Sequence, residues 1–95
     1  MRRHFLVTYD IADDKRRTAV FRILMGNGDH VQFSVFLCQL NGVELERMKG
    51  QLRTVVNTRQ DQALILDLGP ASGELGSRLQ CIGRGYTPPA RVMVI

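Results

Sequence analysis

The chain has 95 residues, 44% of them hydrophobic, and a formal net charge of +4 at pH 7. This length predicts one small domain with a thin core, and the positive charge favours an anionic partner. No apolar run is long enough to cross a membrane or to act as a secretory signal. Cys38 and Cys81 provide neither a metal-ligand spacing nor a disulfide framework. We therefore expect a reduced, cytoplasmic protein that does not contact a membrane.

The first predicted element is a strand over His4–Tyr9, and Asp10 follows it directly. Aromatic, β-branched and apolar residues succeed one another almost without interruption, which is typical of a strand buried on both faces at the centre of a sheet. A carboxylate at the carboxyl end of a central strand is a common component of a site in proteins that layer helices on a sheet. Asp10 is therefore the first candidate functional residue.

A helix is predicted over Asp14–Met25, with Asp13 as its N-cap and with Gly26 and Gly28 ending it. Arg16 and Arg17 lie at the N-terminal end of its apolar face. Because a tight turn joins the strand to this helix, both arginines can lie near Asp10. Each of them can serve a site there, or form a salt bridge that only ties the turn together.

Apolar residues alternate with others over His30–Leu40, which is the period of a strand with two different faces. No turn residue interrupts the pattern, so it fits one long bent strand as well as a tight hairpin. Asn41 then begins a second helix, with Glu44 completing a capping box. The buried stripe of this helix contains Leu45, Met48, Leu52, Val55 and Val56. A polar loop over Asn57–Gln62 follows.

The segment Ala63–Leu68 is again almost wholly apolar, which predicts an interior strand. Turn residues dominate Gly69–Gly76, and Leu79–Ile82 fits a short strand. An apolar strand is predicted over Arg91–Ile95, after Pro88 and Pro89. Such a terminal strand needs a sheet edge to pair with, and we expect it to cross to a partner subunit.

This order predicts an α+β protein whose helices pack on one face of a single sheet. The ferredoxin-like βαββαβ sandwich is the leading candidate, extended by an extra C-terminal strand. We expect a single domain over residues 1–95, in which residues 1–76 form the core and residues 77–95 form a β-rich dimerisation tail.

The chain offers few residues for hydrolytic chemistry, because it has no plausible serine or cysteine triad and no glycine-rich phosphate loop. Hydrolysis of a phosphodiester can instead use a metal ion that activates water. Mg²⁺ usually takes one or two carboxylates with water and phosphate oxygens, so two copies of Asp10 at a dimer axis would satisfy it. Asp13 and Asp14 lie nearby, but each has a structural use at the helix start.

Two segments carry a resemblance to a known family: LVTYDIADDKRRTAVFRIL and, after a glycine-containing turn, VQFSVFLCQL. They resemble the CRISPR-associated protein Cas2 family, whose members share a strand ending in Tyr-Asp-Ile, an Asp-Asp-x-Arg-Arg helix start and a Val-Gln-x-Ser-Val-Phe strand. The resemblance runs from the start of the chain to about Leu52, and the apolar C-terminal strand also fits. It implies a ferredoxin-like homodimer with sheets face to face and C-terminal strands exchanged.

The resemblance also implies a function in CRISPR-based antiviral defense. It implies an endonuclease that uses Mg²⁺, or Mn²⁺ in its place, to cut single-stranded RNA or double-stranded DNA. It further implies a place in spacer acquisition, in which the dimer bridges two dimers of the Cas1 integrase and supports the captured DNA.

Carried over by position, the resemblance assigns metal binding and catalysis to Asp10, and contact with the nucleic-acid backbone to Arg17. Tyr9, Ser34 and Phe36 match supporting positions of the family's strands. Tyr9 and Phe36 suit packing better than catalysis, and Ser34 suits a hydrogen-bonded strand hydroxyl as well as a ligand. His30 stands where many relatives have Arg or Lys. A neutral histidine would bind phosphate more weakly near pH 7.

Three functions stay open at this point. In the first, paired Asp10 residues hold Mg²⁺ while Arg16 or Arg17 neutralises the phosphate. In the second, the dimer is a non-catalytic DNA-binding scaffold for the integrase, and Asp10 performs no chemistry. In the third, the dimer binds a small molecule, which would explain neither Asp10 nor the arginines.

Overall fold

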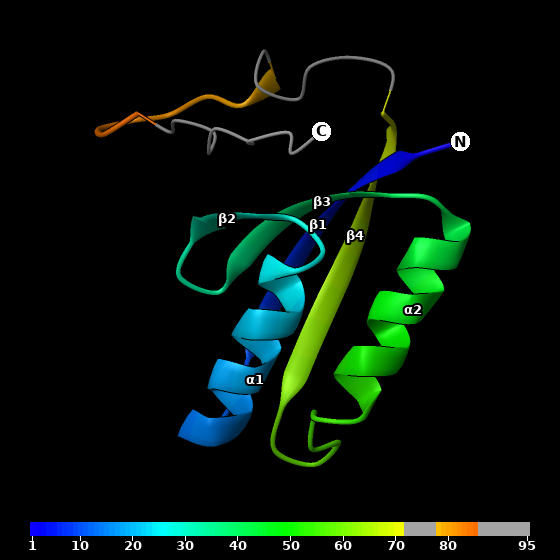
Figure 1. The fold of residues 1–95 in the computed structure, drawn as a ribbon. Helices are drawn as coiled ribbons and strands as arrows, with labels where there is room; N and C mark the ends of the chain where they lie inside the picture. The colour runs from blue at the N-terminus through cyan, green and yellow to red at the C-terminus, as the bar shows by residue number, and fades with distance from the viewer. Residues whose placement is uncertain (72–77, 86–95) are drawn as a thin grey trace, which may run out of the picture.

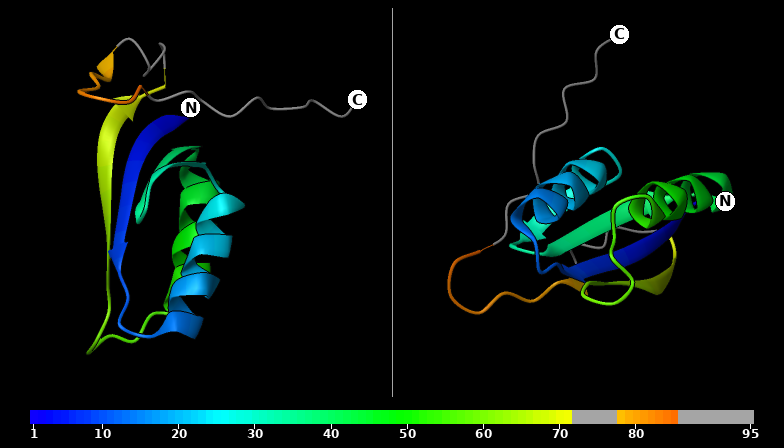
Figure 2. Two further views of the ribbon diagram at one scale, coloured as in Figure 1. Left: turned by 90° about the vertical axis from the view of Figure 1, so that its left-hand side faces the viewer. Right: turned by 90° about the horizontal axis from the view of Figure 1, so that it is seen from below.

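The computed structural model describes residues 1–71 and 78–85 of the chain. One sheet carries two helices on a single face (Figures 1 and 2). The elements in chain order are β1 (Arg3–Asp10), α1 (Asp14–Met25), β2 (Asp29–Gln32), β3 (Val35–Leu40), α2 (Gly42–Arg53) and β4 (Gln62–Pro70). The strands are antiparallel in the order β2-β3-β1-β4. This is the predicted ferredoxin-like arrangement of an α+β protein.

The core lies between the sheet and the helices. Phe5, Val7 and Tyr9 of β1 point into it, and Val20 and Leu24 of α1 meet them there. The prediction that β1 is central is confirmed, but the prediction that both of its faces are buried is wrong for one chain. Alternate residues of β1, including Leu6 and Thr8, stay partly exposed because no helix covers the second face.

The strand predicted over Ala63–Leu68 corresponds to β4, and its predicted interior position is also wrong. Within residues 1–71 and 78–85, β4 pairs only with β1 and forms an edge of the sheet. Leu64 and Leu66 are 54% and 57% exposed, although Ile65 packs against the core. The apolar run is therefore not explained by burial within one chain, since half of its side chains face the uncovered side of the sheet.

Both helix starts are confirmed. Asp13 accepts a hydrogen bond from the backbone N–H of Arg16 at 2.9 Å. Asn41 and Glu44 form the reciprocal capping box, with bonds of 2.8 and 2.9 Å. These bonds satisfy backbone N–H groups that have no partner within a helix, and so they fix where α1 and α2 begin.

The structure decides between the two alternatives for His30–Leu40. A hairpin forms, with β2 and β3 joined by a turn at Phe33 and Ser34. Gly28 makes the approach to this hairpin possible, because a Cβ there would lie 2.5 Å from the backbone oxygen of Leu37. The preceding turn can therefore pass closely over β3 only with glycine at this position.

Part of the C-terminal prediction can be compared with the structure. The short strand predicted over Leu79–Ile82 is wrong, since that segment pairs with no strand in the part of the chain that the structure describes. Gly69 and Pro70 end β4, and Gly69 has a φ of +100° that suits glycine. The strand predicted over Arg91–Ile95 lies outside the described residues, and the division at residues 76 and 77 stays a prediction.

Neither helix over residues 1–71 is long and apolar enough to cross a bilayer.

Candidate active site

Asp10 is the last residue of β1 and lies opposite Gln62 of β4. Its side chain alternates with Tyr9 and so shares the uncovered face of the sheet with Leu6 and Thr8. The residue is exposed, and within the described ranges no other side chain forms a hydrogen bond or ion pair with its carboxylate. Asp10 therefore presents an unengaged carboxylate at the end of the central strand.

Arg17 lies beside the turn that follows Asp10. Its Nη2 donates to the backbone oxygen of Ile11 at 2.9 Å, and its Nη1 contacts the carboxylate of Asp14 at 2.6 Å. The salt bridge expected to tie this turn therefore involves Asp14 rather than Asp10. Because the guanidinium is half-exposed, it remains accessible to an anion next to the strand end.

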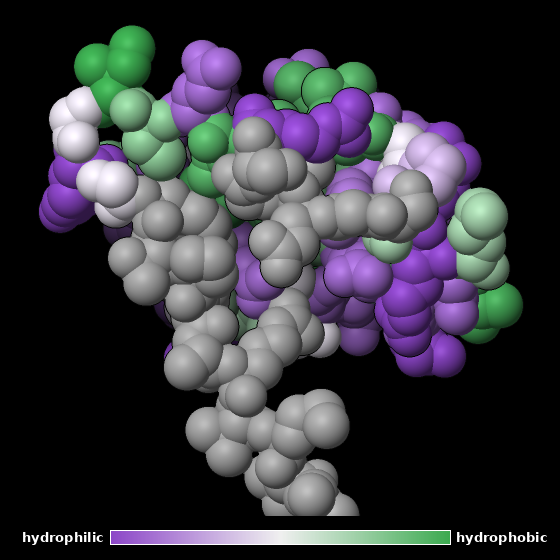
Figure 3. All heavy atoms as spheres, turned by 90° about the horizontal axis from the view of Figure 1, so that it is seen from above, coloured by the Kyte–Doolittle hydropathy of each residue, from purple (hydrophilic) through white to green (hydrophobic). Residues whose placement is uncertain are grey.

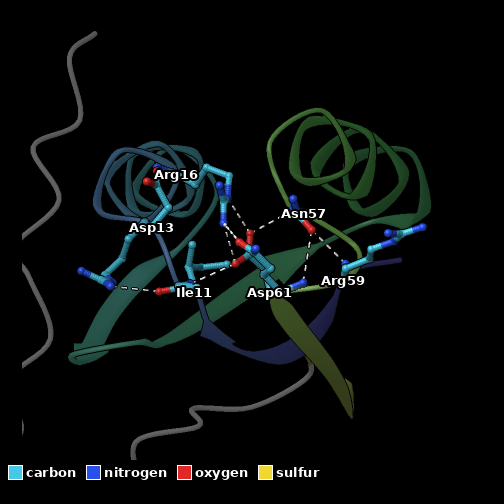
Figure 4. A network of polar contacts seen from close by, with 9 residues as sticks. Ile11, Asp13, Arg16, Asn57, Arg59 and Asp61 are labelled. Carbon is cyan, nitrogen blue, oxygen red and sulfur yellow. Dashed lines mark hydrogen bonds and ion pairs between the residues drawn. The ribbon is translucent and has the colours of Figure 1, made fainter.

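Arg16 occupies a different environment, which Figure 4 shows. Its Nε donates to the carboxylate of Asp61 at 2.8 Å, and its Nη2 contacts Asp61 and Gln60 at 3.2 and 3.1 Å. Among the described residues, the ion pair of Arg16 is thus with the loop before β4 and not with Asp10. A guanidinium committed to this pair has fewer donors to offer a phosphate.

Asp61 is a site-supporting residue that the sequence reading missed. Its carboxylate is completely enclosed and also accepts hydrogen bonds from the backbone N–H groups of Ala12 and Asn57, at 2.9 and 2.8 Å. The side-chain bond from Arg16 and these backbone bonds hold the pKa of Asp61 well below its usual range. The only signal in the sequence was one acidic residue in a polar loop, which is not specific.

Tyr9 and Phe36, both matched to supporting positions, lie in the core. Phe36 is fully buried, and the rings of Tyr9 and Phe36 stack with centroids 6.3 Å apart. Burial raises the pKa of Tyr9, and the positive charge of Arg17 opposes that shift. The hydroxyl therefore stays protonated near neutral pH, and both rings pack beneath the strand end.

Ser34 and His30 lie in the hairpin at the same end of the sheet. The backbone oxygen of Ser34 accepts a hydrogen bond from the N–H of Tyr9 at 3.2 Å, which extends the β1–β3 ladder. The His30 ring packs between Phe21 and Phe36, with centroid separations of 5.2 and 4.9 Å. Its Nε2 donates to the oxygen of Phe33 at 2.7 Å, so this nitrogen stabilises the turn.

Two hollows in the described part of the molecule lie away from Asp10. One of about 820 Å³ is lined by Arg2, Glu44 and Arg47, at the opposite end of the sheet. Figure 3 looks onto that end, where the coloured surface is mostly hydrophilic. The other, of about 720 Å³, lies between the segment 79–82 and the uncovered sheet face. Neither encloses Asp10, which stands on an open surface of the single chain.

The described residues of one chain do not provide a complete metal site around Asp10. Among the described residues, no three His, Cys, Asp or Glu side chains are grouped so that they could hold an ion. Asp13 is used as a helix cap and Asp14 pairs with Arg17. A second copy of the chain would add a second Asp10, and two carboxylates with water and phosphate oxygens are a normal Mg²⁺ environment.

A family model described as CRISPR associated protein Cas2 matches residues 2–73. The chain belongs to the Cas2 family. The chain is 35% identical over 91 residues to a CRISPR-associated endoribonuclease Cas2 from Geobacter sulfurreducens, covering 96% of this chain and 95% of that relative. A second Cas2 endoribonuclease, from Thermodesulfovibrio yellowstonii, is 43% identical over 68 residues, or 72% of this chain and 75% of its own.

The fold agrees with this membership. The crystal structure of Streptococcus pyogenes Cas2 at pH 6.5 superposes with a TM-score of 0.73 at 27% sequence identity. The superposition covers 84% of this chain and 99% of that one. The four-stranded antiparallel sheet with two helices is therefore a Cas2 fold, and the resemblance drawn from the Tyr-Asp-Ile and Ser-Val-Phe segments is confirmed.

Proposed function

We propose that this Cas2 protein is a metal-dependent endonuclease that hydrolyses phosphodiester bonds in single-stranded RNA or double-stranded DNA. The observation that carries the proposal is Asp10, an exposed carboxylate without a side-chain partner in the described chain, at the end of the central strand. A structural aspartate would be expected to cap or pair, as Asp13, Asp14 and Asp61 do. The names of the curated relatives support the same reaction class.

The working unit is proposed to be a homodimer with the uncovered sheet faces packed together and the C-terminal strands exchanged. Leu6, Leu37, Leu64 and Leu66 lie on that face and stay incompletely buried in one chain. Their burial by a second copy would explain why β1 and β4 are apolar on both faces. Because Asp10 alternates onto the same face, the symmetry axis of such a dimer can bring two Asp10 carboxylates together.

Each residue then has a distinct part. The two Asp10 carboxylates would hold Mg²⁺ or Mn²⁺, which when bound activates water and offsets charge on the phosphate. Arg17 would neutralise an adjacent phosphate from the turn that begins α1. Arg16 and His30 are kept as weaker candidates for backbone contact, because Arg16 is paired with the enclosed carboxylate of Asp61 and the His30 ring packs between two aromatic rings. Tyr9, Ser34 and Phe36 would support the strand end.

The biological setting proposed is spacer acquisition with the Cas1 integrase, and a scaffold role is the second candidate. A basic dimer could hold duplex DNA between integrase subunits without cutting it. The net charge of +4 favours such binding. The two functions can coexist, and they differ in whether Asp10 is needed.

The substitution Asp10→Asn tests the nuclease proposal, because it removes the charge and keeps the shape of an exposed residue. We expect the purified variant to lose Mg²⁺-dependent cleavage of labelled single-stranded RNA and double-stranded DNA by more than about 100-fold. Even residues that only orient metal ligands cost about 10- to 100-fold when they are replaced. Glu46→Gln, which removes an exposed charge from α2, is the matched control and should cut normally.

Two outcomes decide between the candidates. Unchanged cleavage by Asp10→Asn would show that this residue does not hold the catalytic metal. Lost cleavage combined with normal spacer acquisition, measured with the Cas1 integrase in cells, would assign the biological role to the scaffold.

A further inference from the structure

Phe33 differs from the other phenylalanines of the chain. It is 92% exposed at the tip of the β2–β3 hairpin. Phe5 and Phe36 are buried, and Phe21 packs against the core, which accounts for all four phenylalanines in the sequence. Leaving an aromatic ring in water forfeits the burial that dominates core energetics. The exposed ring is therefore available to contact a ligand.

The strand register brings the tip of the β2–β3 hairpin to the end of β1 that carries Asp10. Thr8 pairs with Val35 in the antiparallel β1–β3 ladder, and the N–H of Tyr9 bonds to the oxygen of Ser34 at 3.2 Å. Asp10 is the next residue along β1, and Phe33 is the neighbour of Ser34 in the turn, so both lie at the same end of the sheet. In both views of Figure 2 the tip of the hairpin lies beside the end of β1.

The charges around this ring suit a nucleic-acid strand. Arg17 is fixed to the backbone of Ile11, one residue beyond Asp10, and Lys15 is exposed on the first turn of α1. The end of the sheet therefore presents an exposed ring, a carboxylate able to take a metal ion, and cations. Aromatic rings flanked by cations bind single strands, since the ring stacks on a base while the cations contact the backbone.

We propose that Phe33 stacks on an unpaired base next to the phosphate that lies at Asp10, and so favours single-stranded over duplex nucleic acid. A duplex base is already stacked between its neighbours and offers no free face to the ring. The inference rests on the proposed function, because it takes Asp10 as the position of the reacting phosphate. It adds a specificity-determining residue outside the Tyr-Asp-Ile and Ser-Val-Phe positions.

Binding without cleavage tests this proposal. The Asp10→Asn protein without Mg²⁺ is combined with Phe33→Ala, Phe33→Leu or Phe33→Trp, and affinity is measured for a fluorescent single-stranded RNA and for a DNA duplex of equal length. We expect Phe33→Ala and Phe33→Leu to lose roughly tenfold in single-strand affinity, as one base–aromatic stack predicts. Phe33→Trp should keep it, and duplex affinity should not change in any variant.

A single-stranded RNA that carries 2-aminopurine at successive positions reports the stack directly. We expect the 2-aminopurine fluorescence to be quenched at one position of the RNA by the protein with Phe33 and by Phe33→Trp, and at no position by Phe33→Leu. The proposal is overturned if Phe33→Leu binds like the parent protein, or if Phe33→Ala lowers single-strand and duplex affinity equally while it weakens dimerisation in sedimentation. Failure of the nuclease proposal would be seen separately, as metal-dependent cleavage that survives Asp10→Asn.

Discussion

Asp61 links three segments of the chain through one carboxylate. It accepts four hydrogen bonds: from the backbone of Ala12 after β1, from Arg16 twice on α1, and from the backbone of Asn57 after α2. Its neighbour Gln62 pairs with Asp10. The enclosed carboxylate of Asp61 therefore fixes the turn that follows Asp10, and in this way it positions the exposed Asp10.

The ionisation of Asp61 should make stability pH-dependent. Its pKa is depressed in the folded state, so its contribution is complete above the ordinary value of 3.8 and is lost as the pH falls below it. We expect Asp61→Asn to lower Tm at pH 7 by roughly 10 °C, since an amide cannot satisfy all four donors. The difference from the parent protein should shrink towards pH 3, as followed by circular dichroism.

Asp14→Asn is the control for this measurement, because Asp14 is 94% exposed and should leave Tm nearly unchanged. Glu44 and Asp67 also have depressed pKa values, but they are present in parent and variant and cancel in the difference. A Tm difference that stays constant between pH 7 and pH 3 would contradict the role of the charge.

The variants Arg16→Ala and Arg17→Ala should differ in Tm and in the salt dependence of nucleic-acid affinity. Arg17→Ala removes a half-exposed cation and should reduce the slope of log affinity against log salt concentration for nucleic acid by about 1, with little change in Tm. Arg16→Ala leaves Asp61 enclosed without its ion pair and should lower Tm. Fluorescence anisotropy over a salt series measures the salt slope of Arg17→Ala, with Lys49→Ala on α2 as control. Equal salt slopes for parent and Arg17→Ala would contradict backbone contact by Arg17.

At the scale of elements, the β2–β3 hairpin depends on a close approach at Gly28. An added Cβ would lie 2.5 Å from both the Sγ of Cys38 and the oxygen of Leu37, and 2.9 Å from the Cα of Cys38. Two of these three neighbours are backbone atoms, which cannot move without shifting β3. The hairpin also carries Phe33 and holds Ser34 against Tyr9, so its placement affects the site.

We expect Gly28→Ala to lower the free energy of unfolding by roughly 1–3 kcal/mol through overpacking. Gly50→Ala in α2 is the matched control, because a Cβ at Gly50 meets nothing within 4 Å. That change should instead raise stability by about 0.5–1 kcal/mol, as alanine is the better helix former. Urea unfolding of both variants measures the difference. Equal stability of the two variants would mean that the turn relaxes at no cost.

At the scale of the whole molecule, the two faces of the sheet are unequal. One packs on both helices and contains the core, and the other leaves leucines of β1 and β4 incompletely covered. The proposed dimer would bury the second face and place both Asp10 residues at one interface. Assembly and catalysis would then depend on the same surface.

A charge on the uncovered face should therefore break the dimer. We expect Leu66→Asp to convert the protein to a monomer in analytical ultracentrifugation and to lose cleavage with it. Val43→Asp on α2 is the control, because Val43 is 69% exposed and belongs to the helical side of the molecule. A Leu66→Asp protein that remains dimeric would contradict packing of the sheets through this face.

Much of the fold could be predicted from the sequence, because its signals are local. Asp13 and the pair of Asn41 and Glu44 mark the two helix starts through bonds to residues three positions away. The order of strands and helices then restricts the sheet to few topologies. The apolar strands before Asp10 and after the polar loop were recognised for the same reason.

The tertiary structure decided what depends on contacts between distant residues. The interior position of Ala63–Leu68 was predicted wrongly, because an apolar strand does not reveal what covers each of its faces. Asp61 was overlooked, because its partners Ala12 and Arg16 are 49 and 45 residues away. The sequence by itself determined the carboxylate at residue 10 and the elements around it, through local propensity. Only the three-dimensional packing decided which cation stays available beside that carboxylate, because a long-range ion pair occupies Arg16 and leaves Arg17 at the strand end.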